Sequence, residues 1–247
     1  MPMQRFLNGA TTYLRGIQLI SQYGLGIYVW IPVLLSFVLG LLVLGVAWRI
    51  SDDLGGWLIG FYPFEWGRAV FEKVATVMGG VSLVAFTLLL FRYIIMAAAS
   101  PFMSLLSEQL ERKMFPDRPQ VPFRIGKMLK DLVRGIRIAL RNIIREVALT
   151  ILLLIFGIFF PVLSPLIPVL ILILQAYYAG FGNFDFTLER RLSVRESVHF
   201  VQRHRMLVIG NGIVFVLLLM TLVGFLFALP LGTAAAAVVV LEQDNDI

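Results

Sequence analysis

Long stretches without Asp, Glu, Lys or Arg divide the chain into four apolar runs. One charged residue, Arg92, separates the second run from a further uncharged stretch that ends at residue 107. The four runs cover residues 27–48, 74–91, 147–184 and 206–241. A helix needs about 20 apolar residues to cross about 30 Å of hydrocarbon. The first two runs therefore predict spanning helices over about 27–48 and 74–100.

The third and fourth runs are too long for one spanning helix, and both are interrupted. The third run contains Pro161, Pro165 and Pro168. The fourth run is broken around Gly224, Pro230 and Gly232. Because prolines in the middle of the third run leave arms of only about 21 and 24 Å at 1.5 Å per residue, neither arm crosses easily. Each run predicts either one kinked span or a helical hairpin, over about 147–184 and 206–241, that enters and returns on the same side.

The distribution of basic residues favours the hairpins. Segment 108–146 holds ten basic residues against five acids, and segment 185–205 holds five against three. Segment 49–73 holds three basic residues against four acids, whereas 1–26 holds two and no acid. Cytoplasmic loops are enriched in Lys and Arg. Two spans followed by two hairpins place every basic segment on the cytoplasmic side, together with the N-terminus.

Basic residues also form a stripe between the second and third runs. The spacings between them are three or four residues, which places them on one face of a helix over 124–145. The stripe consists of Arg124, Lys127, Lys130, Arg134, Arg137, Arg141 and Arg145. Such an amphipathic helix lies at a membrane interface. It predicts a contact with anionic lipid, or a positive vestibule that concentrates an anion; nucleic-acid binding is the least favoured reading.

Composition supports a membrane protein and removes several chemistries. Hydrophobic residues make up 59% of the 247 residues and charged residues 15%, with a net charge of +6, and the mean hydropathy is +0.88. A soluble domain has about a quarter charged residues. The chain has no cysteine, which excludes disulfides, thiolate catalysis and cysteine-bound metals.

No set of residues predicts catalysis, a metal site or a cofactor site. His199 and His204 are five residues apart, so they do not share a helix face, and no acid lies between them. No nucleophile has a visible base, and no phosphate-binding glycine motif is present. Arg92 is the one candidate inside an apolar run. It predicts either a residue of a transport pathway or an anchor whose side chain reaches the interface.

Four patches, in order along nearly the whole chain, resemble the CysZ-type sulfate permease family, which shares a domain with the etoposide-induced membrane proteins. Residues 13–36 read Y-L-R-G-I-Q-L-I-S-Q-Y-G-L-G-I-Y-V-W-I-P-V-L-L-S. Residues 97–112 read A-A-A-S-P-F-M-S-L-L-S-E-Q-L-E-R and are the most specific patch. Residues 184–188 read F-D-F-T-L and precede S-V-R-E-S-V-H-F-V-Q-R-H-R, and residues 230–237 read P-L-G-T-A-A-A-A.

The resemblance implies a fold and a function. It implies a single domain over residues 1–247: an all-α integral membrane protein with two long transmembrane helices, two partly inserted helical hairpins and amphipathic interfacial helices. It implies a multi-pass protein of the bacterial inner membrane that carries sulfate or a similar anion for cysteine synthesis. The family forms antiparallel dimers that assemble further, so a homo-oligomer in a lipid bilayer is expected. The resemblance does not imply an enzyme, a cofactor or a nucleic-acid partner.

The resemblance also implies which residues act on the anion. A G-L-R-R-like segment before the first span binds sulfate in the family; Gly24 and Leu25 match it, but Gly26 and Ile27 stand at the arginine positions. Backbone N–H groups at Gly26 and the charge of Arg15 are the remaining candidates for binding the anion. Three residues of the second patch match family positions near the ion pathway, which Arg92 extends: Glu108, Glu111 and Arg112.

Two alternatives remain open. The polar residues of the second patch also suit a helix that leaves the bilayer. The missing arginine pair favours a family member that does not transport and instead organises lipid or partner proteins.

Overall fold

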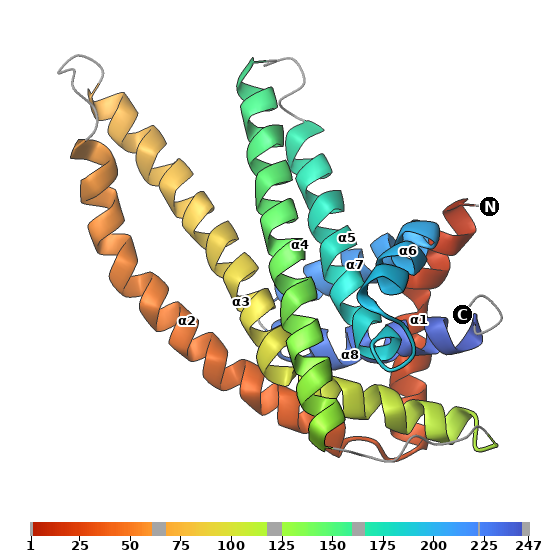
Figure 1. The fold of residues 1–247 in the computed structure, drawn as a ribbon. Coiled ribbons are helices and arrows are strands. Elements are labelled where there is room, and N and C mark those ends of the chain that lie inside the picture. The colour runs from red at the N-terminus through yellow and green to blue at the C-terminus, as the bar shows by residue number, and fades with distance from the viewer. Residues whose placement is uncertain (1, 61–67, 118–124, 160–165, 222, 244–247) are drawn as a thin grey trace.

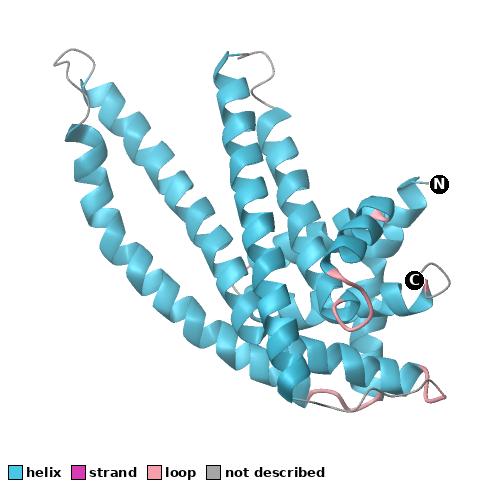
Figure 2. Ribbon diagram, in the orientation of Figure 1, coloured by secondary structure: helices cyan, strands magenta, loops and turns pink. Residues whose placement is uncertain are grey.

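The protein is described from a computed structural model. The backbone is described for residues 2–60, 68–117, 125–159, 166–221 and 223–243, and side chains for 2–46, 91–117, 133–156, 166–221 and 223–243. Within these ranges the chain forms eight helices and no strand (Figure 2). The helices are α1 (Pro2–Gln22), α2 (Ile27–Gly60), α3 (Arg68–Met114), α4 (Ile125–Phe159), α5 (Ile167–Leu188), α6 (Val194–Arg203), α7 (Arg205–Leu219) and α8 (Gly224–Glu242).

The helices form hairpins around a packed base. Figure 1 shows α2 beside α3, and α4 beside α5, with the free ends of both hairpins pointing the same way. The helices α1, α7 and α8 pack at the base, and both termini lie on the same side of the molecule. In the third and fourth apolar runs, α4 packs beside α5 and α7 packs beside α8 in the described helices. The side on which each run enters and leaves a membrane stays a prediction.

Helix boundaries differ from the sequence-based ones in the third run. The predicted basic helix 124–145 and the first arm of the predicted hairpin are one uninterrupted helix, α4, of 35 residues. Its length is about 52 Å at 1.5 Å per residue. No proline or glycine occurs between Gly135 and Gly157, so the change from basic to apolar composition alters the surroundings of the helix without ending it.

The break in the fourth run lies at the turn between α7 and α8, next to Gly224 but before Pro230, both of which the sequence analysis named. Pro230 and Gly232 are buried inside α8. At the turn, the Thr221 hydroxyl donates to the Leu218 carbonyl at 2.9 Å and accepts from the Gly224 N–H at 3.0 Å. This hydroxyl satisfies one backbone group at each helix end, so the chain reverses where Thr221 lies.

Three described helices are long and apolar enough to cross a membrane: Ile27–Val46, Ile167–Leu188 and Gly224–Glu242. The pair α6 and α7, bent by 90°, also passes this test as one unit. Large apolar side chains on α2 are exposed, among them Trp30 and Leu34 at 63% and 65%. A helix that is apolar all round and outwardly exposed fits a lipid solvent, so the fold is that of an all-α membrane protein.

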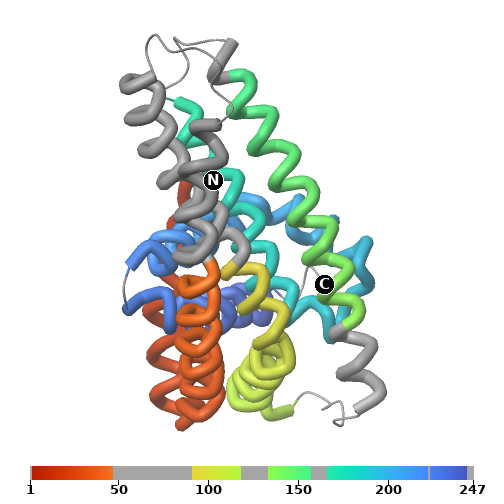
Figure 3. The backbone as a smooth tube through the Cα atoms, turned by 90° about the vertical axis from the view of Figure 1, so that its left-hand side faces the viewer, coloured from red at the N-terminus to blue at the C-terminus, as the bar shows by residue number. Residues whose placement is uncertain are grey.

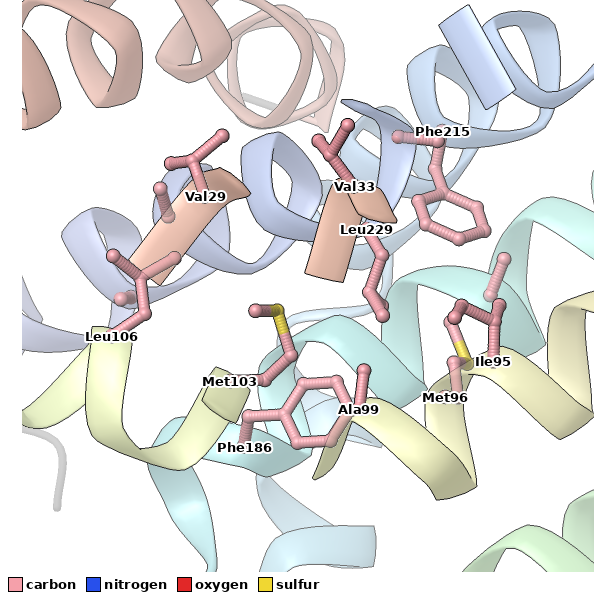
Figure 4. Packing of buried hydrophobic residues seen from close by; sticks show 14 of the residues in the cluster. Val29, Val33, Ile95, Met96, Ala99, Met103, Leu106, Phe186, Phe215 and Leu229 are labelled. Carbon is pink, nitrogen blue, oxygen red and sulfur yellow. The ribbon is translucent and has the colours of Figure 1, made fainter. Parts of the chain in front are cut away.

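The base is held by two cores and one buried amide. In the first core, side chains of α2, α3, α5, α7 and α8 point toward one another (Figure 4). The second core contains side chains from each of the helices α4, α5, α6, α7 and α8, packed around Phe181 and Phe184. Between them, the Asn211 amide accepts from Asn183 at 2.8 Å and donates to the Gly232 carbonyl at 3.1 Å. The Tyr13 hydroxyl donates to the Asn211 carbonyl at 2.9 Å, so one residue of α7 connects α1, α5 and α8.

Candidate functional site

The helices α3, α4 and α5 meet along faces that carry charged and hydroxyl side chains. Figure 3 shows α4 along one edge of the molecule, with α5 beside it. The inner face of α4 presents Arg134, Asn142 and Glu146, of which Asn142 and Glu146 are fully buried. Contacting helix faces in membranes usually carry small and apolar residues. Ionised side chains on such faces are energetically costly. In this protein they form three clusters between α3, α4 and α5, which are together called the charged interface.

The first group is the deep pair, Arg92 of α3 and Glu146 of α4. These side chains are 4% and 0% exposed and form an ion pair through Nη2 and Oε2. The Tyr93 hydroxyl donates to the same Oε2 at 2.6 Å, and Arg92 Nη1 donates to the Gln175 carbonyl of α5 at 3.3 Å. Arg92 therefore connects three helices inside the protein.

The second group is the central pair, Arg134 of α4 and Asp185 of α5. Arg134 Nη1 donates to both Asp185 oxygens, at 3.1 and 3.0 Å, and Nη2 donates to the Ser197 hydroxyl of α6 at 2.6 Å. Their side chains are 13% and 8% exposed. On α4, the central and deep pairs are twelve residues apart, which is about 18 Å along the helix.

The third group is the basal cluster, where the last turns of α3 meet the end of α5. It consists of Ser104, Ser107, Glu108, Glu111, Arg112, Thr187, Glu189, Arg190 and Arg191. Glu111 forms ion pairs with Arg190, at 2.8 Å, and with Arg191. Arg190 also donates to the Ser107 hydroxyl at 2.8 Å, which lies 2.8 Å from the Thr187 hydroxyl. Burial lowers the pKa of the Arg190 guanidinium from its usual value, while the Glu111 carboxylate raises it.

The residues predicted from the second patch meet in the basal cluster. Glu108 pairs with Arg112 at 2.7 Å, one turn along the same helix, while Glu111 faces the arginines after α5. The second and third family-like patches are thus in contact through the Ser107 and Thr187 hydroxyls. Arg92 lies apart from this cluster, sixteen residues before Glu108 in α3, which is about 24 Å along the helix at 1.5 Å per residue.

A proline explains how α3 reaches the basal cluster. Pro101 lies inside α3, and Figure 1 shows α3 turning from the hairpin into a run across the base. Proline removes a helical hydrogen bond and kinks the helix. Beyond it, Met103, Leu106 and Leu110 are fully buried in the first core. Neighbouring serines and Glu111 on the same part of α3 contact residues at and just after the end of α5.

The predicted anion-binding residues form the turn between α1 and α2. Gly24 has φ +66°, a conformation that glycine adopts at little cost. The Leu25 side chain is 4% exposed in the first core, so only its backbone is available. Added to Gly26, a Cβ would meet only Trp30, at 4.0 Å. The N–H groups of Gly26 and Ile27 lie at the N-terminal end of α2. They precede the first backbone hydrogen bond there, which runs from the Tyr28 N–H to the Leu25 carbonyl at 3.1 Å.

Arg15 is not brought to this turn. It lies seven residues before the end of α1 and forms an ion pair with Glu242 at the end of α8. Both side chains are partly exposed, at 56% and 39%. Arg15 thus lies about 10 Å from the C-terminal end of α1, at 1.5 Å per residue. It already has a carboxylate partner, Glu242.

The predicted basic face of α4 is split by the fold. Arg134 turns inward to the central pair, Arg141 is half-buried, and Arg137 and Arg145 are exposed. The side chains of Arg124, Lys127 and Lys130 lie outside the described residues. The lipid-contact and vestibule interpretations therefore apply to the two exposed arginines, whereas Arg134 has a partner inside the protein.

Sequence reasoning missed five charged members of the charged interface: Glu146, Asp185, Glu189, Arg190 and Arg191. Two of them carried a usable signal. Glu146 is the last charge before the third apolar run, and Asp185 is the first charge after it. Charges that border an apolar run enter the packed protein when the helix continues past the run. Among the described residues, no three His, Asp or Glu side chains are grouped so that they could hold a metal ion.

Comparison with known proteins gives a family. No curated protein matches the chain significantly. A family model described as sulfate transporter CysZ/etoposide-induced protein 2.4 matches residues 12–230, which is nearly the whole chain. The match includes the turn at Gly24, the charged interface and the beginning of α8, up to Pro230. This all-α membrane protein therefore belongs to the family of the sulfate transporter CysZ and etoposide-induced protein 2.4.

Proposed function

We propose that this protein is a permease or channel for a small oxyanion, sulfate, in a bacterial inner membrane, where it supplies sulfur assimilation and cysteine synthesis. Family membership supports the class of transported anion. It supports a transporter over an enzyme, because the family is of the transporter type. The charged interface is the observation that carries the proposal.

The argument from the charged interface is energetic. Ionised side chains within a membrane protein are expensive, and replacing a buried ion pair by apolar residues is often neutral or stabilising. Stability alone therefore does not explain the deep and central pairs, one above the other on α4. Arginine forks that pair with carboxylates also fit the oxygens of an oxyanion. A series of such groups gives an anion successive partners along the helices.

The predicted residues have distinct roles in this proposal. The backbone N–H groups at Gly26 and the start of α2 receive the anion at the turn that Gly24 and Leu25 form, and Arg15 contributes its charge only when it leaves Glu242. Glu108, Glu111 and Arg112 adjust the charge of the basal cluster, and Arg92 acts deeper in the membrane.

The proposed setting is a lipid bilayer containing a homo-oligomer with antiparallel protomers and partly inserted hairpins. Exposed apolar side chains on α1 support a lipid or protomer contact. They recur on one helix face, at Met3, Leu7, Leu14 and Ile17. The exposed Arg137 and Arg145 of α4 suit anionic headgroups.

Radiolabelled sulfate uptake into liposomes that contain the purified protein tests the proposal. We expect uptake above that of empty liposomes, and a large loss in Arg92→Gln, which removes the deepest cation. The matched control is Arg203→Gln, because Arg203 is exposed on α6 and outside the charged interface; it should retain uptake. Uptake equal to that of empty liposomes, at every pH and ionic strength tried, contradicts the proposed function.

One observation favours a second candidate, a non-transporting member of the family that organises lipid or partner proteins. The turn at Gly24 lacks the arginine pair of the sulfate-binding segment, and Arg15 is engaged with Glu242. The same uptake measurement separates the two functions, because only the transporter accumulates label.

A further inference from the structure

The deep pair contains polar atoms that the ion pair does not satisfy. Both hydrogen bonds to Glu146, from Arg92 and Tyr93, end on Oε2. Glu146 Oε1 is buried and has no hydrogen-bond partner among the described residues, and neither has the Thr150 hydroxyl one turn further along α4. A buried charged group with an unpaired atom is destabilising. The Asp185 carboxylate differs, since both its oxygens accept from Arg134.

Titratable groups face Glu146 from both helices that pack against α4. Arg92 and Tyr93 come from α3, and Tyr178 of α5 lies within electrostatic reach. On α4 itself, Arg145 precedes Glu146 and is exposed. Among the described residues, Arg92 is the one cation that is both buried and bonded to Glu146. Any loss of the carboxylate charge therefore leaves a buried guanidinium without a counter-ion, which is strongly unfavourable.

We infer that the deep pair is a proton-linked anion site, in which Arg92 exchanges the Glu146 carboxylate for the passing oxyanion as Glu146 takes up a proton. The inference rests on the proposed function. The exchange balances: the proton binds Glu146 at Oε1, the carboxylate becomes a neutral acid, and the oxyanion replaces it on the guanidinium. Arg92 has an anionic partner before and after. Release of the oxyanion returns the proton and restores the ion pair.

The arrangement of atoms suits this exchange. Oε1 has no donor to displace, so a proton adds without breaking either hydrogen bond to Oε2. The Thr150 hydroxyl on the same face of α4 is an available acceptor for the new O–H. Arg92 Nε is also without a partner among the described residues, so Nε and a freed Nη group present the planar fork that binds two oxygens of an oxyanion.

Sulfate uptake into liposomes of fixed lipid composition, measured over a series of pH values, tests the inference. A requirement for one proton at the site should raise the wild-type rate on acidification, by up to about tenfold for each pH unit. Glu146→Gln keeps the shape and removes the titration, so its rate should not vary with pH. The matched control is Glu196→Gln, an exposed carboxylate of α6, which should keep the wild-type slope.

Proton uptake on sulfate binding provides a second readout that does not need transport. Purified protein in a weakly buffered solution with a pH indicator should take up a proton for each sulfate bound, and Glu146→Gln should take up none. If Glu146→Gln does not fold, Tyr93→Phe serves instead. It removes one hydrogen bond to the carboxylate form and should move the rate profile toward higher pH.

The outcomes separate the two proposals. No sulfate uptake by the wild type contradicts the proposed function, and this site with it. Wild-type uptake with a flat pH profile, or a Glu146→Gln variant that keeps the wild-type slope and proton uptake, overturns the proton-linked site alone.

Discussion

The contact between α5 and α7 makes a sharp prediction about Gly212. The α7 backbone packs directly against α5 there, since a Cβ added to Gly212 would lie 2.6 Å from the Ala176 carbonyl carbon and 2.8 Å from the Gly180 nitrogen. It would lie closer still to the Ala176 carbonyl oxygen. All three atoms are backbone, so no rotamer change relieves the clash. We expect Gly212→Ala to destabilise the fold severely.

The magnitude follows from the separation that a methyl group requires. Carbon atoms in contact prefer about 3.5 Å or more, so the two helices must move apart by roughly 1 Å, which forfeits up to about half the dispersion energy of each contact. Inserting a methyl group into a packed interior typically costs 1–3 kcal/mol. Because the obstacle is backbone, we expect about 3 kcal/mol, measured as the free energy of unfolding in mixed micelles by tryptophan fluorescence.

Two other glycines provide matched controls. A Cβ added at Gly45 of α2 or Gly135 of α4 meets no atom within 4 Å. Alanine is the better helix former by about 1 kcal/mol, so Gly45→Ala and Gly135→Ala should leave stability unchanged or slightly raise it. If Gly212→Ala were as stable as these controls, the close approach of α5 and α7 would be wrong.

Three further changes have clear expectations. Arg134→Leu leaves the buried Asp185 carboxylate unpaired and should cost about 3–5 kcal/mol of unfolding free energy, while adding Asp185→Leu should restore most of it; no recovery in the double variant would argue against the central pair. Ser193→Ala removes the side-chain cap that accepts from the Glu196 N–H at 3.4 Å and should destabilise α6 by about 1 kcal/mol, seen as faster amide hydrogen exchange confined to α6. Thr221→Val removes both hydrogen bonds of the turn before α8 and should lower the free energy of unfolding by about 1–2 kcal/mol. An unchanged unfolding midpoint would show that the Thr221 hydroxyl does not stabilise the turn.

The sequence located the helices better than it located their ends. Charge-free runs predicted apolar helices, and the structure has helices in each run. The ends were less predictable because they depend on local hydrogen bonds and packing. The fourth run was expected to break around Gly224, Pro230 and Gly232; the break lies just before Gly224, whereas Pro230 and Gly232 are buried inside α8. The reversal lies where Thr221 satisfies the backbone, a feature that hydropathy does not record.

The candidate site was predictable only in part. The family-like patches pointed to Glu108, Glu111 and Arg112, and the structure places all three in the basal cluster. Arg92 was conspicuous because it interrupts an apolar run. Its partner, Glu146, is 54 positions away. Many carboxylates in the chain were equally eligible, because the choice depends on which faces of α3 and α4 meet.

The sequence by itself determined the solvent of this protein and its class of secondary structure. An apolar helix satisfies its backbone internally and exposes its side chains to lipid, so composition and run length are sufficient to predict it. Tertiary structure decided where the charges lie. Helices with weak periodicity, such as α3 and α5, carry little information about which face turns inward, and their inward faces became known only with their packing. The basic stripe of α4 was clear in the sequence, but it did not show that Arg134 turns inward. That packing buries Arg92 with Glu146 and Arg134 with Asp185, because an ionised group inside the protein requires a partner within hydrogen-bonding distance.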